Sequence, residues 1–177
     1  MLERLNLPFT CCSPDIDESR LAGEDLEDQV LRLAEAKARA VAGRVDPALV
    51  IGSDQLADLN GTALGKPGNH ANAAIQLRQM SGQRVRFLTS ICLFNTSSGR
   101  LQLELVPFDV FFRSLTGEEI ESYLQKEQPY QCAGSFKSEA LGITLVERMS
   151  GPDPTALVGL PLLSLTTMLR NENYKLV

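Results

Sequence analysis

The chain has 177 residues, of which 44% are hydrophobic and 22% charged, and its formal net charge is −5 at pH 7. This length and composition are typical of one globular domain with a substantial core. The negative charge argues against a broad surface for nucleic acid polymers. It does not argue against a small nucleotide, because a bound metal can supply positive charge.

The sequence shows neither a targeting signal nor a cysteine motif. No stretch is apolar for long enough to span a bilayer, and residues 1–14 lack the basic and apolar regions of a signal peptide. None of the four cysteines belongs to a Cys-x-x-Cys motif, and the single histidine gives little material for a zinc site. We therefore expect a cytoplasmic protein with free thiols.

The N-terminal part predicts one short helix and one long helix. Residues 1–5 have helical composition without a preceding cap, residues 9–12 suggest a short strand, and residues 13–18 form an acidic loop. Across residues 26–41, apolar side chains recur at three- and four-residue steps, and acidic side chains fill the first turns. Gly43 is expected to end this helix.

The middle of the chain is expected to be rich in strands. The apolar run 48–51 predicts a short buried strand. Asn60-Gly61 is a two-residue turn signal, so residues 56–65 are expected to form a β-hairpin. A helix and two long strands are predicted next: residues 71–80, 85–95 and 101–113.

The last third combines two helices with one strand. Thr116 and Glu119 have the spacing of a capping box, which predicts a helix to about residue 125. The apolar run 141–146 predicts a strand, and residues 161–169 predict a final helix that begins near a proline. Long strands mixed with helices indicate an α/β fold with a mixed β-sheet and flanking helices.

The stretch Ile51-Gly52-Ser53-Asp54-Gln55 is the most informative part of the sequence. A strand that ends at Gly52-Ser53 would place Asp54 at its carboxyl end, where ligands bind in open α/β sheets. Lys66 follows in a Gly-Lys-Pro turn. A carboxylate and a lysine at a strand end suit a phosphate ester and its divalent metal, although a strand entering a polar turn would look the same.

The side chains available for catalysis exclude most hydrolase mechanisms. His70 lies in a polar turn and is expected on the surface, and no serine or cysteine motif supports it as a base. A hydrolase of this sequence would therefore depend on carboxylates and a metal. The candidate carboxylates are Asp15, Asp17, Glu18, Asp54, Asp58, Glu139 and Glu147.

Four motifs resemble the Maf family of nucleotide pyrophosphatases, and the resemblance extends over residues 2–169. The motifs are Ile51–Gln55, Gly65–Pro67, Cys132–Glu139 and Val158–Leu162. They are most similar to the YceF branch, whose members hydrolyse 7-methyl-GTP to the monophosphate and diphosphate. The resemblance implies a single Maf-like domain over residues 1–177, with a central cleft as in Maf and ITPase folds.

The resemblance also implies which residues handle the phosphates. Asp54 matches the family's proton acceptor, which could orient a water directly or hold a metal ion that does so. Glu18 matches a glutamate near the metal, so Glu18 and Asp54 are expected to bind Mg²⁺ or Mn²⁺. Lys37 and Lys66 match phosphate-contacting lysines. Lys37 could instead be a helix lysine that extends past an apolar face to solvent.

Gln55 and Glu139 match positions that select the base in the family. Guanine presents two adjacent N–H donors, which a buried carboxylate at Glu139 could accept as a pair. The positive charge of N7-methylguanine would favour a carboxylate or an aromatic face. Phe136 could provide that face or could pack in the core, and Lys137 could pair with a nearby acid.

One departure from the family concerns the N-terminus. The family opens with a strand and a Ser-x-Ser-x-x-Arg-Arg loop that cradles phosphates, whereas this sequence begins at the helix that follows. We expect either that the start codon was assigned too late or that the protein lacks this loop. Family members are commonly dimeric, which makes a homodimer an expectation.

The resemblance favours a hydrolase acting on the α–β phosphoanhydride of 7-methyl-GTP. One alternative is the Maf branch that hydrolyses dTTP and UTP, which differs over residues 135–139. Another is a nucleotide-binding regulator without turnover. In each case the expected partner is a small-molecule nucleotide, and neither a nucleic acid polymer nor a membrane is expected.

Overall fold

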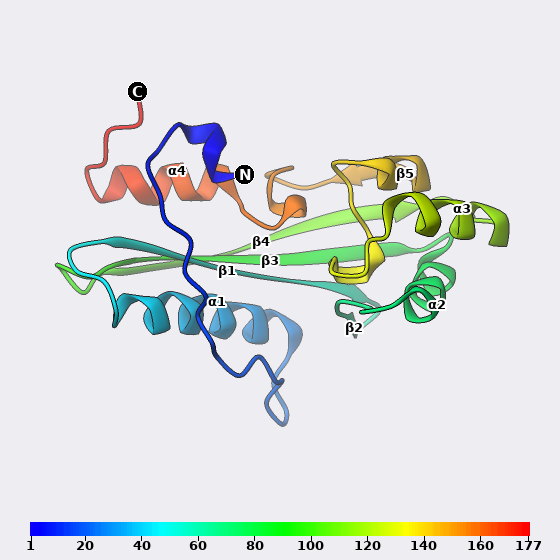
Figure 1. Cartoon of the computed structure of the whole chain (residues 1–177), viewed down its shortest axis with the longest axis horizontal. Coiled ribbons are helices and arrows are strands. Elements are labelled where there is room, and N and C mark those ends of the chain that lie inside the picture. The colour runs from blue at the N-terminus through cyan, green and yellow to red at the C-terminus, as the bar shows by residue number, and fades with distance from the viewer. The chain divides into compact units, whose positions relative to one another are not determined.

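The computed structural model describes residues 1–177, and the chain divides into two compact units (Figure 1). Unit 1 comprises Met1–Asp54, Thr89–Val106 and Asp153–Val177, and unit 2 comprises Gln55–Leu88 and Pro107–Pro152. Each unit combines helices with strands, so the predicted α/β fold is confirmed. The central cleft stays a prediction.

Five strands form one sheet in the order β2-β1-β3-β4-β5. β1 pairs antiparallel with β2, and β4 pairs antiparallel with β5. β1 and β4 begin in unit 1 and end in unit 2, whereas β3 begins in unit 2 and ends in unit 1, so both units draw on the same strands. The sheet is therefore antiparallel rather than mixed as predicted. The strands are β1 Leu49–Leu59, β2 Thr62–Leu64, β3 Arg84–Asn95, β4 Leu101–Phe112 and β5 Val146–Ser150.

The predicted hairpin between β1 and β2 is confirmed. Leu59 pairs with Thr62 across a two-residue turn. Asn60 and Gly61 both have positive φ angles, of 53° and 86°. A tight hairpin turn needs this left-handed backbone, which asparagine and glycine adopt more readily than other residues.

Four α-helices lie close to their predicted positions. Side chains cap the first three: Asp25, Asn69 and Thr116 each accept a hydrogen bond from a backbone N–H of the following turn. The predicted capping box of Thr116 and Glu119 is confirmed. No helix combines the length and the apolar character needed to cross a membrane. The helices are α1 Leu26–Ala42, α2 His70–Met80, α3 Gly117–Glu127 and α4 Leu162–Asn171.

The core of unit 1 has one helix on each face of the sheet (Figure 1). Ile91 and Leu93 of β3 pack with the apolar side chains of α4. Cys92, which points to the opposite face, packs with Ala34 and Ala38 of α1. All four cysteines of the chain are free.

The core of unit 2 is built on aromatic side chains and two helices. α2 contributes the buried Leu77 and Met80, and α3 contributes Tyr123 and other apolar residues. Phe136 is buried, and its ring centroid lies 5.7 Å from that of Phe87 and 5.1 Å from that of Phe112. Of the two roles considered for Phe136, the structure therefore shows core packing.

Two predicted strands are wrong. Residues 9–12 are exposed and have no regular structure, because no strand lies beside them to pair with their backbone. Leu141–Leu145 forms a 3₁₀ turn, and the strand begins only at Val146. The turn forms because the carbonyl of Lys137 accepts hydrogen bonds from the N–H groups of Ala140 and Gly142.

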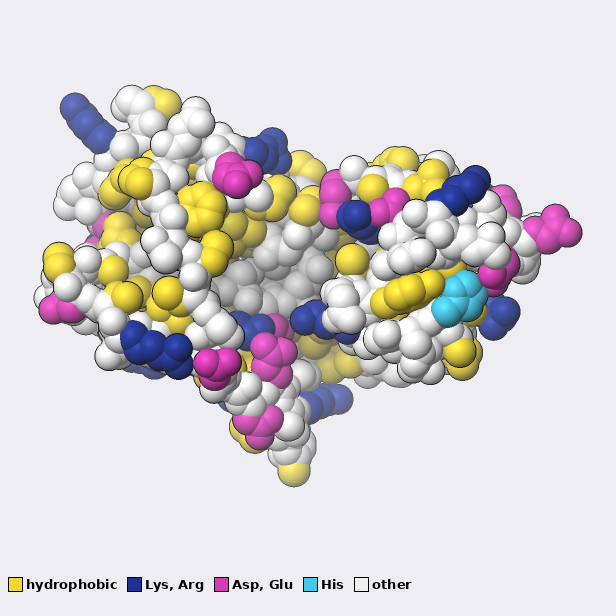
Figure 2. Space-filling view, viewed as in Figure 1, with side chains coloured by type: hydrophobic (Ala, Val, Ile, Leu, Met, Phe, Trp, Pro, Cys, Tyr) yellow, Lys and Arg dark blue, Asp and Glu magenta, His cyan; other side chains and the backbone are white.

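Unit 1 contains a cavity of about 1280 Å³ beside the start of β1. β2 pairs with β1 only over Ala57–Leu59, so the outer edge of Leu49–Ser53 has no strand partner. In Figure 2, hydrophobic side chains gather over this region of unit 1. The cavity is lined mainly by residues 7–12, residues 44–51, Leu160, Leu169 and Tyr174.

Candidate active site

Asp54 lies inside a long strand and not at a strand end. The prediction of a strand end was wrong because β1 continues through Gly52 and Ser53 to Leu59. The Ser53 hydroxyl lies 2.7 Å from the carbonyl oxygen of Ser90 and 2.9 Å from that of Gly159. Side chains alternate along a strand, so Asp54 is directed to the face opposite Ser53, which is the face of Gly52 and α1.

Gly52 allows α1 to lie directly against this face of β1. A Cβ atom built on Gly52 would lie 2.2 Å from the carbonyl oxygen of Ala34 and 2.8 Å from the backbone nitrogen of Ala38. No side chain larger than hydrogen fits between the two elements. The close approach brings Lys37, which directly precedes Ala38 on α1, within reach of Asp54.

Lys37 joins two of the predicted carboxylates. Its Nζ lies 2.7 Å from Oδ1 of Asp54 and 2.8 Å from Oε1 of Glu18. The Lys37 and Asp54 side chains are only 18% and 12% exposed, whereas Glu18 is 51% exposed. The structure thus brings together three site residues that the sequence placed 17 and 19 positions apart. Lys37 is an ion-paired lysine, not one that merely extends to solvent.

The environment of Lys37 favours its charged form. Burial alone would lower its pKa, but hydrogen bonds and charges from Asp54 and Glu18 outweigh this effect and raise the pKa above its ordinary value. Lys37 therefore carries a full positive charge at neutral pH. An ammonium group between two carboxylates can orient both and can offset phosphate charge.

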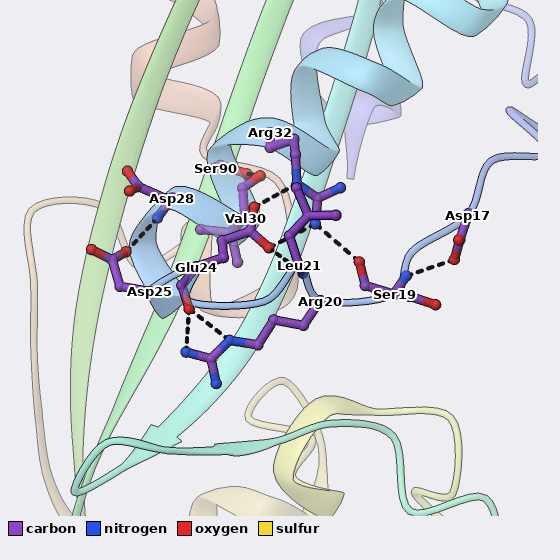
Figure 3. A network of polar contacts seen from close by, with 10 residues as sticks. All are labelled: Asp17, Ser19, Arg20, Leu21, Glu24, Asp25, Asp28, Val30, Arg32 and Ser90. Carbon is purple, nitrogen blue, oxygen red and sulfur yellow. Dashed lines mark hydrogen bonds and ion pairs between the residues drawn. The ribbon is translucent and has the colours of Figure 1, made fainter.

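An arginine–glutamate pair holds the loop that carries Glu18 (Figure 3). Nε of Arg32 lies 2.5 Å from Oε1 of Glu24, and its Nη2 lies 2.8 Å from Oε2, a two-point contact typical of arginine and carboxylate. Nη2 also donates to the carbonyl of Ser19 at 3.1 Å, and the Ser19 N–H donates to Asp17 at 2.8 Å. The residues on both sides of Glu18 are therefore tied down.

This clamp of Arg32 and Glu24 was not predicted from the sequence. The hydrogen bond from Arg32 lowers the pKa of Glu24 from 4.5 to about 2. The pKa of Arg32 is raised, first by Glu24 and to a smaller extent by the charges of Asp17 and Asp54. Arg32 thus adds positive charge near Asp54. The one feature of the sequence that could have indicated the clamp is an arginine on the helix turn before Lys37.

Lys66 and Glu139 lie in unit 2, together with Gln55. The turn of Lys66 contacts the Glu139 segment, because the Gly134 N–H donates to the carbonyl of Gly65 at 3.2 Å. The pKa of Cys132 is raised by burial and by the charge of Glu139, and the charge of Lys66 opposes this shift. The charges of Lys66 and Glu139 thus both affect the Cys132 thiol, with opposite signs.

The structure shows how exposed the two predicted base-selecting residues are and which acid pairs with Lys137. Glu139 is exposed rather than buried, and its one hydrogen bond joins it to the Ser138 hydroxyl at 3.4 Å. It is exposed because it lies at the tip of a turn rather than in the core. Gln55 is half-buried in β1, next to Asp54. Lys137 pairs with Glu127, which confirms the predicted pairing with an acid.

The remaining candidates have local structural roles. His70 is partly exposed and interacts with Glu121 at 2.9 Å, which confirms its surface position. Asp58 accepts a hydrogen bond from the Gly61 N–H in the hairpin, and Asp15 accepts one from Ser13. None of these residues joins the cluster of Lys37.

The carboxylates of Glu18 and Asp54 have donor atoms that suit a hard divalent cation. No group of three or more His, Cys, Asp or Glu side chains could hold a metal. Both carboxylates nevertheless contact the same ammonium group, so one oxygen of each lies beside Nζ of Lys37. Mg²⁺ commonly takes one or two protein carboxylates and completes its shell with water and substrate phosphates. The residues present fit that kind of site.

Comparison with known proteins shows similarity to one protein family over both units of the chain. Residues 1–172 match the family described as Maf-like protein. The chain is 55% identical over 174 residues to a protein of Nitrosococcus oceani named 7-methyl-GTP pyrophosphatase, covering 98% of the chain and 87% of the relative. It is 51% identical over 177 residues to a protein of Methylobacillus flagellatus with the same name, covering 100% and 92%.

Proposed function

The chain belongs to the Maf family, and from this premise we propose that it hydrolyses 7-methyl-GTP to 7-methyl-GMP and diphosphate. The proposal rests on one observation, which is that Lys37 forms ion pairs with both Asp54 and Glu18. Two relatives at 55% and 51% identity bear the name 7-methyl-GTP pyrophosphatase, which supports the same substrate here.

Asp54 acts as the base in the proposed reaction. It accepts a proton from a water molecule whose oxygen bonds to the α-phosphorus, while the bond from that phosphorus to the bridging α–β oxygen breaks. Diphosphate leaves with the electron pair of that bond. Lys37 orients Asp54 through their 2.7 Å contact and offsets negative charge that develops on the phosphates.

Glu18 and Asp54 would hold the divalent cation, Mg²⁺ or Mn²⁺. When bound, the cation would neutralise phosphate charge and polarise the phosphoryl oxygens. Arg32 and Glu24 keep the loop of Glu18 in place for this role. Lys66 supplies a second positive charge for the phosphates.

Gln55 and Glu139 read the base. A carboxylate can accept two hydrogen bonds from the adjacent N–H donors of guanine, which uracil and thymine cannot offer in the same arrangement. The charge of N7-methylguanine adds attraction. The exposed position of Glu139 leaves its carboxylate available to a ligand. The cytoplasmic location, the homodimer and the single-domain extent all stay predictions.

Release of diphosphate tests this proposal directly. Purified protein with Mg²⁺ or Mn²⁺ is given 7-methyl-GTP, GTP, dTTP or UTP in turn, and diphosphate is quantified. We expect 7-methyl-GTP to have the highest kcat/KM. A preference for dTTP and UTP would favour the other Maf branch. Nucleotide binding without diphosphate release would favour a regulator.

A further inference from the structure

The segment of Glu139 is held in place by residues that have no assigned role. Glu139 lies between two short 3₁₀ turns, Ala133–Ser135 and Leu141–Leu145. Its own carboxylate is exposed and has only a weak contact with Ser138. The position of Glu139 therefore depends on its neighbours in the chain.

One carboxylate on α3 holds both sides of Glu139. Oε1 of Glu127 lies 2.7 Å from Nζ of Lys137, and its Oε2 accepts a hydrogen bond from the Leu141 N–H at 3.1 Å. Lys137 comes two residues before Glu139 and Leu141 comes two residues after it. The Glu127 side chain is only 13% exposed, so water competes little for these contacts.

A buried phenol fixes the start of the same segment. The Tyr123 hydroxyl donates to the carbonyl of Ser135 at 3.2 Å and accepts from the Lys137 N–H at 3.1 Å. Tyr123 is 2% exposed, and Phe136 between these two partners is anchored in the core. Tyr123 and Glu127 lie one helical turn apart, so α3 presents both groups to the segment on one side.

From these contacts we infer that Glu127, Lys137 and Tyr123 are positioning residues that set base selection by holding Glu139. The inference rests on the proposed function, in which Glu139 reads the base. A recognising group discriminates well only when its neighbours keep it in place before the ligand arrives. Release of the segment would let Glu139 adopt many positions, so the correct base would lose its advantage over others.

The test compares kcat/KM for 7-methyl-GTP with kcat/KM for UTP in single variants. In Glu127→Gln and Tyr123→Phe we expect this ratio to fall about tenfold, the order expected for losing hydrogen bonds of a charged or buried group. Glu118→Gln is the matched control, because Glu118 is exposed on the same helix and no hydrogen bond or ion pair joins it to the segment. Its ratio should equal that of the unmodified protein.

Two further comparisons separate positioning from a general structural role. If Glu127 acts through Glu139, then adding Glu127→Gln to Glu139→Gln should cause no further fall in the ratio. Lys137→Met should lower the ratio, whereas Lys137→Arg keeps the ion pair with Glu127 and should restore it. Thermal unfolding of each variant shows whether the fold is retained.

The inference is overturned if the variants lose activity equally toward both nucleotides, or if the effects of Glu127 and Glu139 on the ratio simply add. An unmodified protein that releases no diphosphate from 7-methyl-GTP overturns the proposed function instead. The variants are then compared by the ratio of their dissociation constants for 7-methyl-GTP and UTP. An unchanged ratio there overturns the positioning role as well.

Discussion

Asp54 is the single residue on which the proposed chemistry depends most. Asp54→Asn keeps the shape of the side chain and an oxygen for Lys37, but it removes the base. We expect turnover to fall about 100-fold or more, within the range for loss of a general base. The melting temperature should fall somewhat, because Lys37 keeps only its ion pair with Glu18, but the protein should remain folded. Asp58→Asn, in the same strand, is the control, and near-normal diphosphate release by Asp54→Asn would contradict the assignment.

Variants of the two proposed phosphate lysines should differ in thermal stability but not in base selectivity. Lys37→Met and Lys66→Met should each slow turnover of every nucleotide by a similar factor, since phosphate contacts do not distinguish bases. Lys37→Met should also lower the melting temperature, because it removes the ion pair with the largely buried Asp54. Lys66 is exposed, so its variant should melt normally. A loss confined to one base would show that the role is misassigned.

At the scale of single residues, the resemblance to the Maf family selected side chains that lie close together, and their roles stay predictions. The family motifs identified Glu18, Lys37 and Asp54, and the structure brings these residues together. The clamp of Arg32 and Glu24 was missed because the pairing depends on how a loop folds back on a helix. Glu139 was wrongly expected to be buried. The chemistry of its carboxylate indicates that it can recognise a base, but it does not determine whether the side chain is buried.

At the scale of secondary structure, the contact of α1 with β1 controls the distance from Lys37 to Asp54. In Gly52→Ala the new methyl group would meet backbone atoms of Ala34 and Ala38, so the helix must move. We expect a loss of about 1–3 kcal/mol, as for other overpacked sites, with a fall of several degrees in melting temperature. Activity should fall with it.

Gly117→Ala is the matched control for Gly52→Ala. A Cβ atom at Gly117 meets nothing within 4 Å. The control should therefore retain both its melting temperature and its activity. If Gly52→Ala behaved in the same way as this control, α1 would not be the element that positions Lys37.

The clamp of Arg32 and Glu24 should respond to acid in a defined direction. The folded pKa of Glu24, about 2, lies below its ordinary value of 4.5. Its contribution to the free energy of unfolding is therefore fully present above about pH 4.5 and is lost as the pH falls toward 2. The stability difference between the unmodified protein and Glu24→Gln, measured by urea unfolding, should be constant near neutral pH and shrink with acid.

Glu27→Gln provides the comparison for the acid experiment, because Glu27 is exposed in the first turn of the same helix. Its stability is measured over the same pH range, so that the general effect of losing one acidic side chain can be subtracted from that of Glu24→Gln. A difference for Glu24→Gln that grew in acid would contradict the clamp.

Helices were predicted well and some strands poorly, for a physical reason. The signals at Asp25 and Thr116 act within one turn of the chain, so they can be read locally. A strand also needs a partner, and partners come from distant parts of the sequence. Residues 9–12 have strand-like side chains but no neighbouring strand, whereas β1 continues past Gly52 because its partners continue with it.

At the scale of the whole molecule, the chain distributes its proposed roles between its two units. Unit 1 carries Glu18, Lys37 and Asp54, and unit 2 carries Gln55, Lys66 and Glu139. The boundary passes between Asp54 and Gln55, which are neighbours in β1. The face shown in Figure 2 has acidic and basic side chains interspersed.

The outer edge of β1 makes self-association a hazard for this protein. Leu49, Val50 and Ile51 are apolar, favour extended backbone, and present main-chain groups that no strand covers on that side. Such an edge can template a strand from another molecule. We expect light scattering from the folded protein to rise with protein concentration. Scattering that is low and independent of concentration would show that the N-terminal segment shields the edge well enough.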